Sequence, residues 1–112
     1  MSMLEKRRYQ RLPVKFPVTI RCQGRLMPAT MLNLSCGGAC IRADDVDLSS
    51  DLSVELVFDF ESGQRDVSMR GRIVHTQNTS DGVPASFVGI RFSNLFSDGH
   101  KAIQDYLRKN LN

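Results

Sequence analysis

Hydrophobic and polar side chains alternate along most of the chain after position 13. In the first such stretch one face carries Val14, Phe16, Val18, Ile20 and Cys22. Because successive residues of a β-strand point to opposite sides, this period of two predicts a strand with one buried face. The dipeptide Gln23-Gly24 then supplies a turn.

The next stretch, 27–35, predicts a second strand. Alternation places Thr30, Leu32 and Leu34 on one face, and it places Met31, Asn33 and Ser35 on the other. Gly37-Gly38 permits backbone conformations closed to other residues, and a short strand over 39–41 follows. Asn33, Ser35 and the glycines are therefore expected at a strand end.

Strict alternation resumes in the second half of the chain, over Val54, Leu56, Phe58 and Phe60. A turn at 61–64 leads to a partner strand carrying Val67, Met69, Gly71, Ile73 and His75. A loop over 77–84 precedes a last strand at 87–92. Six strand candidates with hairpin-length connections predict an antiparallel barrel or sandwich.

The hydrophobic period changes to that of a helix near the C-terminus, at Ile103, Tyr106, Leu107 and Leu111. Ser97 or Asp98 can serve as the N-cap. The apolar stripe is expected to cover an open end or face of the barrel, with partner binding as the alternative. His100 has no visible partner in the sequence and is assigned no role.

A length of 112 residues fits one domain with a single core. Residues 1–13 hold few apolar side chains and are expected to form a flexible arm, followed by the folded domain over 14–112. No apolar run approaches the roughly 18 residues of a membrane span, and no secretory signal is visible. A soluble, cytoplasmic protein is expected.

The net charge of +3 is unevenly distributed. Cations crowd the first quarter, at Lys6, Arg7, Arg8, Arg11, Lys15, Arg21 and Arg25. Acids dominate the middle, at Asp44, Asp45, Asp47, Asp51, Glu55, Asp59, Glu61 and Asp66. This asymmetry indicates that the N-terminal segment meets a polyanion, while the middle is a solvated face or a partner surface.

The three cysteines, Cys22, Cys36 and Cys40, form an odd set without a Cys-x-x-Cys pair, and no histidine lies close enough in sequence to complete a familiar zinc pattern. They are expected to be reduced, structural thiols, and no metal or cofactor is expected. No Ser/His/Asp, Cys/His or paired-carboxylate arrangement appears at informative spacing, so no catalysis is expected.

Two groups of residues suit an anionic nucleotide. Arg7, Arg8 and Arg11 present guanidinium forks that match two phosphate oxygens or the O6/N7 edge of guanine. Asn33 can donate and accept hydrogen bonds at a base edge, and Ser35 adds a hydroxyl. Gly38 is expected to let the backbone approach a flat or charged ligand.

Together these groups resemble the paired signature of PilZ domains, Arg7-x-x-x-Arg11 followed by Asn33-x-Ser35-x-x-Gly38. The segments 12–14, 71–74 and 88–92 also stand in the order typical of that family. The resemblance implies a six-stranded antiparallel β-barrel of split-barrel type with a C-terminal helix. It also implies a non-catalytic receptor for the bacterial second messenger cyclic di-GMP (c-di-GMP).

Carried over from the family, Arg7 and Arg11 would grip phosphates and guanine edges, while Asn33, Ser35 and Gly38 would hold the other guanine face and edge. Many relatives have aspartate where this chain has Asn33. Lys6 precedes the first motif arginine, where a cation is associated with a stacked pair of ligands. Candidates for further ligand contacts are Lys6, Arg8, Gly37 and His75. The His75 ring could stack on guanine, and the alternative that the sequence favours is an exposed histidine at a strand end.

Ligand binding is expected to order the arm and so build a surface for a separate effector protein. The family implies control of motility, surface attachment or exopolysaccharide output. One alternative is a small β-barrel that binds single-stranded nucleic acid, although the absence of Trp and the acidic middle oppose it. Another is a PilZ-like interaction module that no longer binds ligand.

Overall fold

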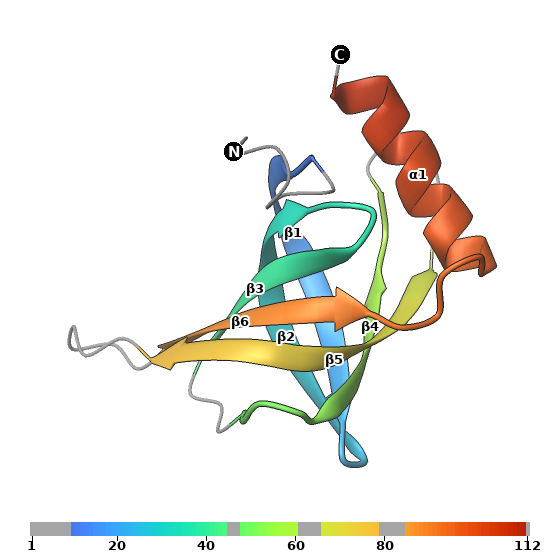
Figure 1. Ribbon diagram of the computed structural model, residues 1–112. Coiled ribbons are helices and arrows are strands. Elements are labelled where there is room, and N and C mark those ends of the chain that lie inside the picture. Colours follow the sequence, from blue (N-terminus) through green and yellow to red (C-terminus); the bar gives the residue numbers. More distant parts are fainter. Residues whose placement is uncertain (1–9, 45–47, 61–65, 79–84, 112) are drawn as a thin grey trace, which may run out of the picture.

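Six strands form a closed antiparallel β-barrel in the computed structural model, which describes residues 10–44, 48–60, 66–78 and 85–111 (Figure 1). The elements are β1 (Leu12–Cys22), β2 (Arg25–Leu34), β3 (Gly38–Asp44), β4 (Ser53–Phe58), β5 (Val67–Asn78), β6 (Ala85–Phe92) and α1 (Asp98–Asn110). Neighbouring strands follow the order β1-β2-β3-β6-β5-β4, and β4 pairs with β1 to close the barrel. The predicted barrel and C-terminal helix are confirmed.

Alternation along β1 places the apolar side chains inside, with Val18 and Ile20 buried and Thr19 exposed. The β1–β2 hairpin turns through Gln23 and Gly24, whose φ angles are 53° and 78°. Positive φ at both central residues is the geometry of a type I′ turn, whose twist matches that of paired strands. The local sequence pattern therefore determines this hairpin.

Three register irregularities interrupt the ladders. They lie between Pro13 and Phe16 in the β1–β2 pair, between Met31 and Asn33 in β2–β3, and between Ile73 and His75 in β5–β6. A bulge inserts an extra residue and so changes which side chains face the core. The strand alternation predicted from the sequence fails at these points.

The bulge in β2 brings both Met31 and Leu34 into the core, where each is fully buried. The prediction that Met31 shares a face with Asn33 was therefore wrong. The bulge in β5 likewise places His75 and Ile73 on opposite faces of the strand. Ile73 is fully buried, whereas His75 is exposed and pairs with Gly89 on the outer surface.

Strand ends also differ from the prediction in places. β3 continues to Asp44 rather than ending at 41, and β4 ends at Phe58, with Phe60 buried beyond it. Leu12 and Pro13 already pair with β2. The predicted turn at 61–64 and the loop residues 79–84 lie outside the described residues, as do positions 1–9 of the arm.

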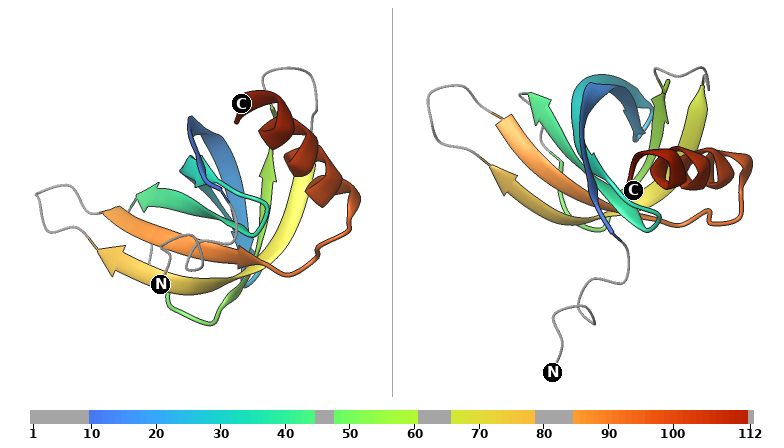
Figure 2. Two further views of the ribbon diagram at one scale, coloured as in Figure 1. Left: turned by 45° about the horizontal axis from the view of Figure 1, so that its top comes forward. Right: turned by 90° about the horizontal axis from the view of Figure 1, so that it is seen from above.

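Helix α1 lies beside the end of β4 and the start of β5 (Figure 2). Ser97 is the N-cap, as predicted, and its hydroxyl accepts from the backbone N–H of His100. Ile103 and Leu107 are buried in the barrel core. A Cβ on Gly99 would overlap the carbonyl oxygen of Ser68, so glycine allows the first helical turn to pack directly on β5.

Candidate functional site

The predicted ligand residues gather where the start of β1, the end of β2 and the β2–β3 turn meet. Arg11 is exposed directly before β1, Asn33 is half-buried near the end of β2, and 35–38 forms the turn into β3. The predicted contacts Lys6, Arg7 and Arg8 lie outside the described residues. The structure thus brings together Arg11, Asn33, Ser35, Gly37 and Gly38.

Ser35 is only 7% exposed, and its side chain makes hydrogen bonds within the β2–β3 turn. Its hydroxyl oxygen accepts from the backbone N–H of Gly37 at 3.2 Å and of Gly38 at 3.1 Å. The hydroxyl also donates to the Gly38 carbonyl oxygen at 3.2 Å. The backbone N–H of Ser35 donates to the same oxygen at 2.9 Å. The side chain therefore holds the turn in one shape.

Gly38 is required by strand packing. A Cβ at this position would overlap the carbonyl oxygen of Ile90 on β6. Next to it, the Gly37 carbonyl accepts from the Phe92 backbone N–H at 2.9 Å. Neither Gly37 nor Gly38 has positive φ, so the expectation of a backbone conformation closed to other residues was wrong. Close approach to β6 explains Gly38 instead.

Asn33 stands in a row of cross-strand partners that crosses five strands. Its register partners are Pro13 on β1 and Cys40 on β3, and Cys40 in turn pairs with Gly89 on β6 and Gly89 with His75 on β5. Directly paired residues share one face of a sheet. The three register irregularities adjoin this row, so they turn Asn33 and His75 outward together.

The surface between Asn33 and His75 carries only small side chains. Cys40 and Gly89 are half-buried, and a Cβ on Gly89 would make only ordinary contacts, the shortest of them 3.5 Å to the Cβ of His75. Gly89 therefore contributes no side chain to the outer face between Cys40 and His75. A flat ring could rest there without displacing a side chain.

Arg11 extends its charge over the same face. Burial raises the pKa of the Cys40 thiol, and the Arg11 guanidinium acts against this by lowering it. Arg11 directly precedes Leu12, which pairs with Leu34, the residue next to Asn33. Arg11 and Asn33 therefore lie at the adjoining ends of β1 and β2, and their contact with a ligand stays a prediction. All three cysteines are free.

Sequence reasoning missed His100, which is only 6% exposed. Its imidazole ring makes two hydrogen bonds to backbone groups. Its Nδ1 accepts from the Phe96 backbone N–H at 3.3 Å, so its Nε2 carries the proton and donates to the Cys36 carbonyl at 2.8 Å. This bond ties α1 to the 35–38 turn across 64 positions. No local sequence signal could indicate it.

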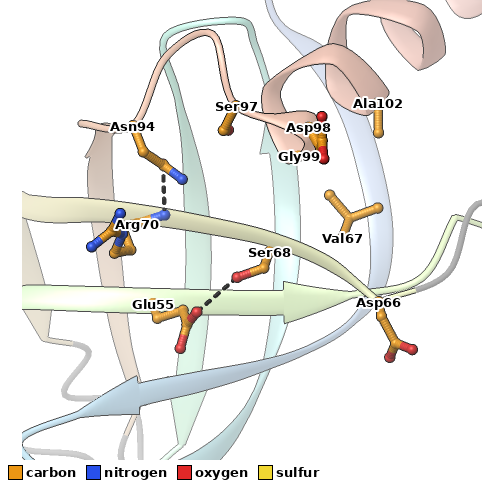
Figure 3. Close-up of a pocket in the computed structure, with 10 residues that line it drawn as sticks. All are labelled: Glu55, Asp66, Val67, Ser68, Arg70, Asn94, Ser97, Asp98, Gly99 and Ala102. Atoms are coloured by element: carbon orange, nitrogen blue, oxygen red, sulfur yellow. Dashed lines mark hydrogen bonds between the residues drawn. The ribbon is translucent and has the colours of Figure 1, made fainter.

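A separate hollow of about 600 Å³ lies where α1 begins above β4 and β5 (Figure 3). Its polar groups are partly paired: Ser68 donates to Glu55 at 2.7 Å, and the Asn94 side-chain oxygen accepts from the Arg70 backbone at 2.8 Å. It contains none of the predicted ligand residues. Its wall also carries the carboxylates of Asp66 and Asp98, whose negative charge does not suit an anionic ligand.

Within the described segments, no three His, Cys, Asp or Glu residues are grouped as metal ligands. The helix in this part of the chain is too short and too polar to cross a bilayer.

Comparison with known proteins finds one matching sequence family and several structures of similar fold. The family described as PilZ domain matches residues 5–109. No curated protein matches the chain.

Several solved structures share the fold. The inhibitor of motility from Bacillus subtilis is 21% identical with a TM-score of 0.76, over 96% of this chain and 52% of its own. This chain thus spans about half of that protein. The PilZ domain of YcgR from Escherichia coli, solved with c-di-GMP, is 15% identical with a TM-score of 0.68, over 93% and 90%. The PilZ domain of CeSA from a cellulose-synthesizing bacterium is 14% identical with a TM-score of 0.63, over 92% and 99%.

Proposed function

The chain belongs to the PilZ domain family, and from this premise we propose that it binds c-di-GMP and acts as a non-catalytic receptor. One observation carries the proposal: Asn33, the 35–38 turn and Arg11 lie together where the ends of β1, β2 and β3 adjoin. The PilZ domain of YcgR, which has the same fold, was solved with that ligand.

The residues divide between contact and support. In this proposal Asn33 hydrogen-bonds a guanine edge, and the Arg7 and Arg11 guanidiniums supply bidentate donors for phosphates and for the O6/N7 edge. Ser35 and Gly38 act on the ligand through the turn that they shape, because the Ser35 hydroxyl is already bonded to Gly37 and Gly38. The low surface at Gly89 offers a place for a base, with His75 beside it.

The basic arm completes the site as its second half. In this proposal the part of the arm that precedes β1 becomes ordered when its charge is neutralised by the ligand, which creates a surface for a separate effector protein. Lys6, directly before the first motif arginine, favours a stacked pair of ligands over a single one.

Calorimetric titration with c-di-GMP tests the receptor function. Arg7→Ala and Arg11→Ala should each weaken binding by about tenfold or more, because a hydrogen bond to a charged group contributes about 1.5–3 kcal/mol. Arg25→Ala is the matched control, since Arg25 is exposed beside the β1–β2 turn and away from Asn33. A folded wild-type protein that produces no heat at high micromolar ligand would contradict the proposal.

The same titration measures stoichiometry. Two ligands per chain are expected if Lys6 promotes the stacked pair, and one ligand per chain would contradict that part of the proposal while leaving the receptor function intact.

A further inference from the structure

Two arginines face each other directly on the outer surface of the barrel. Arg72 on β5 and Arg91 on β6 are register partners, and both are exposed. Like charges directly opposite each other destabilise a pair of strands. Two other sheet arginines have acids beside them: Arg21 lies 3.5 Å from Glu55, and Arg42 lies 3.1 Å from Asp44.

The opposed pair has no such compensation in the part of the chain that the structure describes. Neither Arg72 nor Arg91 makes an ion pair or a side-chain hydrogen bond there. Two guanidiniums side by side without a carboxylate form a strong local positive potential. They present the donors that a phosphate needs for bidentate binding from both sides.

This pair adjoins the candidate ligand site. On its other side Arg91 pairs with Gly38, the last residue of the turn that Ser35 closes. Along β6, Arg91 is two residues from Gly89, which corresponds to about 7 Å on the same face of a strand. Gly38 and Gly89 carry no side chains, so nothing on these positions separates the arginines from the surface beside Asn33 and Cys40.

We propose that Arg72 and Arg91 form a phosphate-binding subsite that extends the ligand site across β6 onto β5, opposite the side from which Arg11 approaches. The inference rests on the proposed function, because it assigns these arginines to a phosphate of the bound cyclic dinucleotide. Such a ligand carries two phosphates, so a second basic group at a distance from Arg11 matches its charge distribution. The repulsion within the pair would then be relieved on binding.

Arg72→Gln and Arg91→Gln test the subsite by two measurements on the full chain. In titrations with c-di-GMP each variant should lose about tenfold in affinity, as expected for a charged hydrogen bond. In thermal unfolding without ligand each should melt higher, by about 1–5 °C, because a like-charge repulsion is removed. Residues with a merely structural role would lower the melting temperature when replaced.

The controls separate failure of the subsite from failure of the receptor function. Arg25→Gln should leave the affinity unchanged, and Arg11→Ala should reduce it. If Arg11→Ala weakens binding while Arg72→Gln and Arg91→Gln do not, the subsite is overturned and the receptor function stands. If the folded wild type binds no c-di-GMP, both are overturned. Weaker binding combined with a higher melting temperature in the two Gln variants supports the subsite.

Discussion

At the scale of single residues, the environment of Cys40 reports on the candidate site. Burial raises the pKa of its thiol, while the Arg11 guanidinium and a backbone hydrogen bond from Ile41 lower it. Cys36, on the neighbouring turn, has a pKa raised by burial without a contribution from Arg11. Of the two thiols only that of Cys40 is subject to the Arg11 charge, so Cys36 can serve as its internal control.

Replacing Arg11 should change the reactivity of Cys40 alone. Without the guanidinium the thiolate of Cys40 loses a stabilising charge, so its pKa should rise further in Arg11→Gln. At a fixed mildly alkaline pH its maleimide labelling should slow, because the thiolate is the reacting form. Peptide mass spectrometry across a pH series would measure this, with Cys36 as internal control. Equal slowing of both thiols would contradict the placement of Arg11 beside Cys40.

Bound ligand should also shield Cys40, since its register partner is Asn33. That protection distinguishes binding at this face from binding at the hollow between α1 and β5, which lies elsewhere on the surface.

At the scale of elements, α1 is hydrogen-bonded to the 35–38 turn of the candidate site through the side chain of His100. His100 connects the helix to the Cys36 carbonyl within the 35–38 turn, and it also holds the Phe96 backbone N–H. Phe96 has a φ of 71°, which is unfavourable for a side chain of this size, and its ring is 91% exposed. The hydrogen bond from Phe96 to His100 helps to hold that conformation.

His100→Phe should preserve the buried volume and remove both hydrogen bonds. We expect the free energy of unfolding to fall by about 1–3 kcal/mol, because the Cys36 carbonyl loses its buried partner. Amide hydrogen exchange at Gly37 and Gly38 should accelerate, since the turn loses its link to the helix. His75→Phe, at an exposed position, is the control. Unchanged exchange at the turn in His100→Phe would show that α1 does not support it.

At the scale of the whole molecule, an aromatic cluster joins elements far apart in sequence. Phe16 of β1 stacks on Phe58 of β4 with ring centroids 5.6 Å apart, and Phe58 meets Phe60 at 5.3 Å. Phe60 in turn stacks on Tyr106 of α1 at 4.1 Å. β1 and β4 also close the barrel, although their register covers only 19–21 and 55–57. The cluster therefore reinforces the seam and anchors the helix.

Tyr106→Ala should lower the free energy of unfolding by about 2 kcal/mol, because it removes a stacked ring pair together with the apolar area that the ring buries. Urea denaturation followed by circular dichroism would measure the change. Gln104→Ala, at an exposed position of the same helix, should have little effect. Equal stability of the two variants would mean that the Phe60–Tyr106 contact does not anchor α1.

Much of this architecture can be predicted from local patterns. The period of two identified the six strands, and the change to a helical period together with Ser97 located α1. These features follow from neighbouring residues, because side-chain alternation and N-capping depend on positions at most a few residues apart. The grouping of Arg11, Asn33 and the 35–38 turn was also predictable, through their spacing and resemblance to one family.

Other features required the tertiary structure. The bulges that bury Met31 and expose His75 depend on how β2 and β5 pair with their neighbours, and register is not encoded in alternation alone. The bond between His100 and Cys36, and the pairing of Arg72 with Arg91, join positions separated in sequence. Local patterns along the chain thus account for the elements and for the chemistry of the motif. Barrel closure decided which of those side chains share a surface, because only the pairing of distant strands brings them to one face.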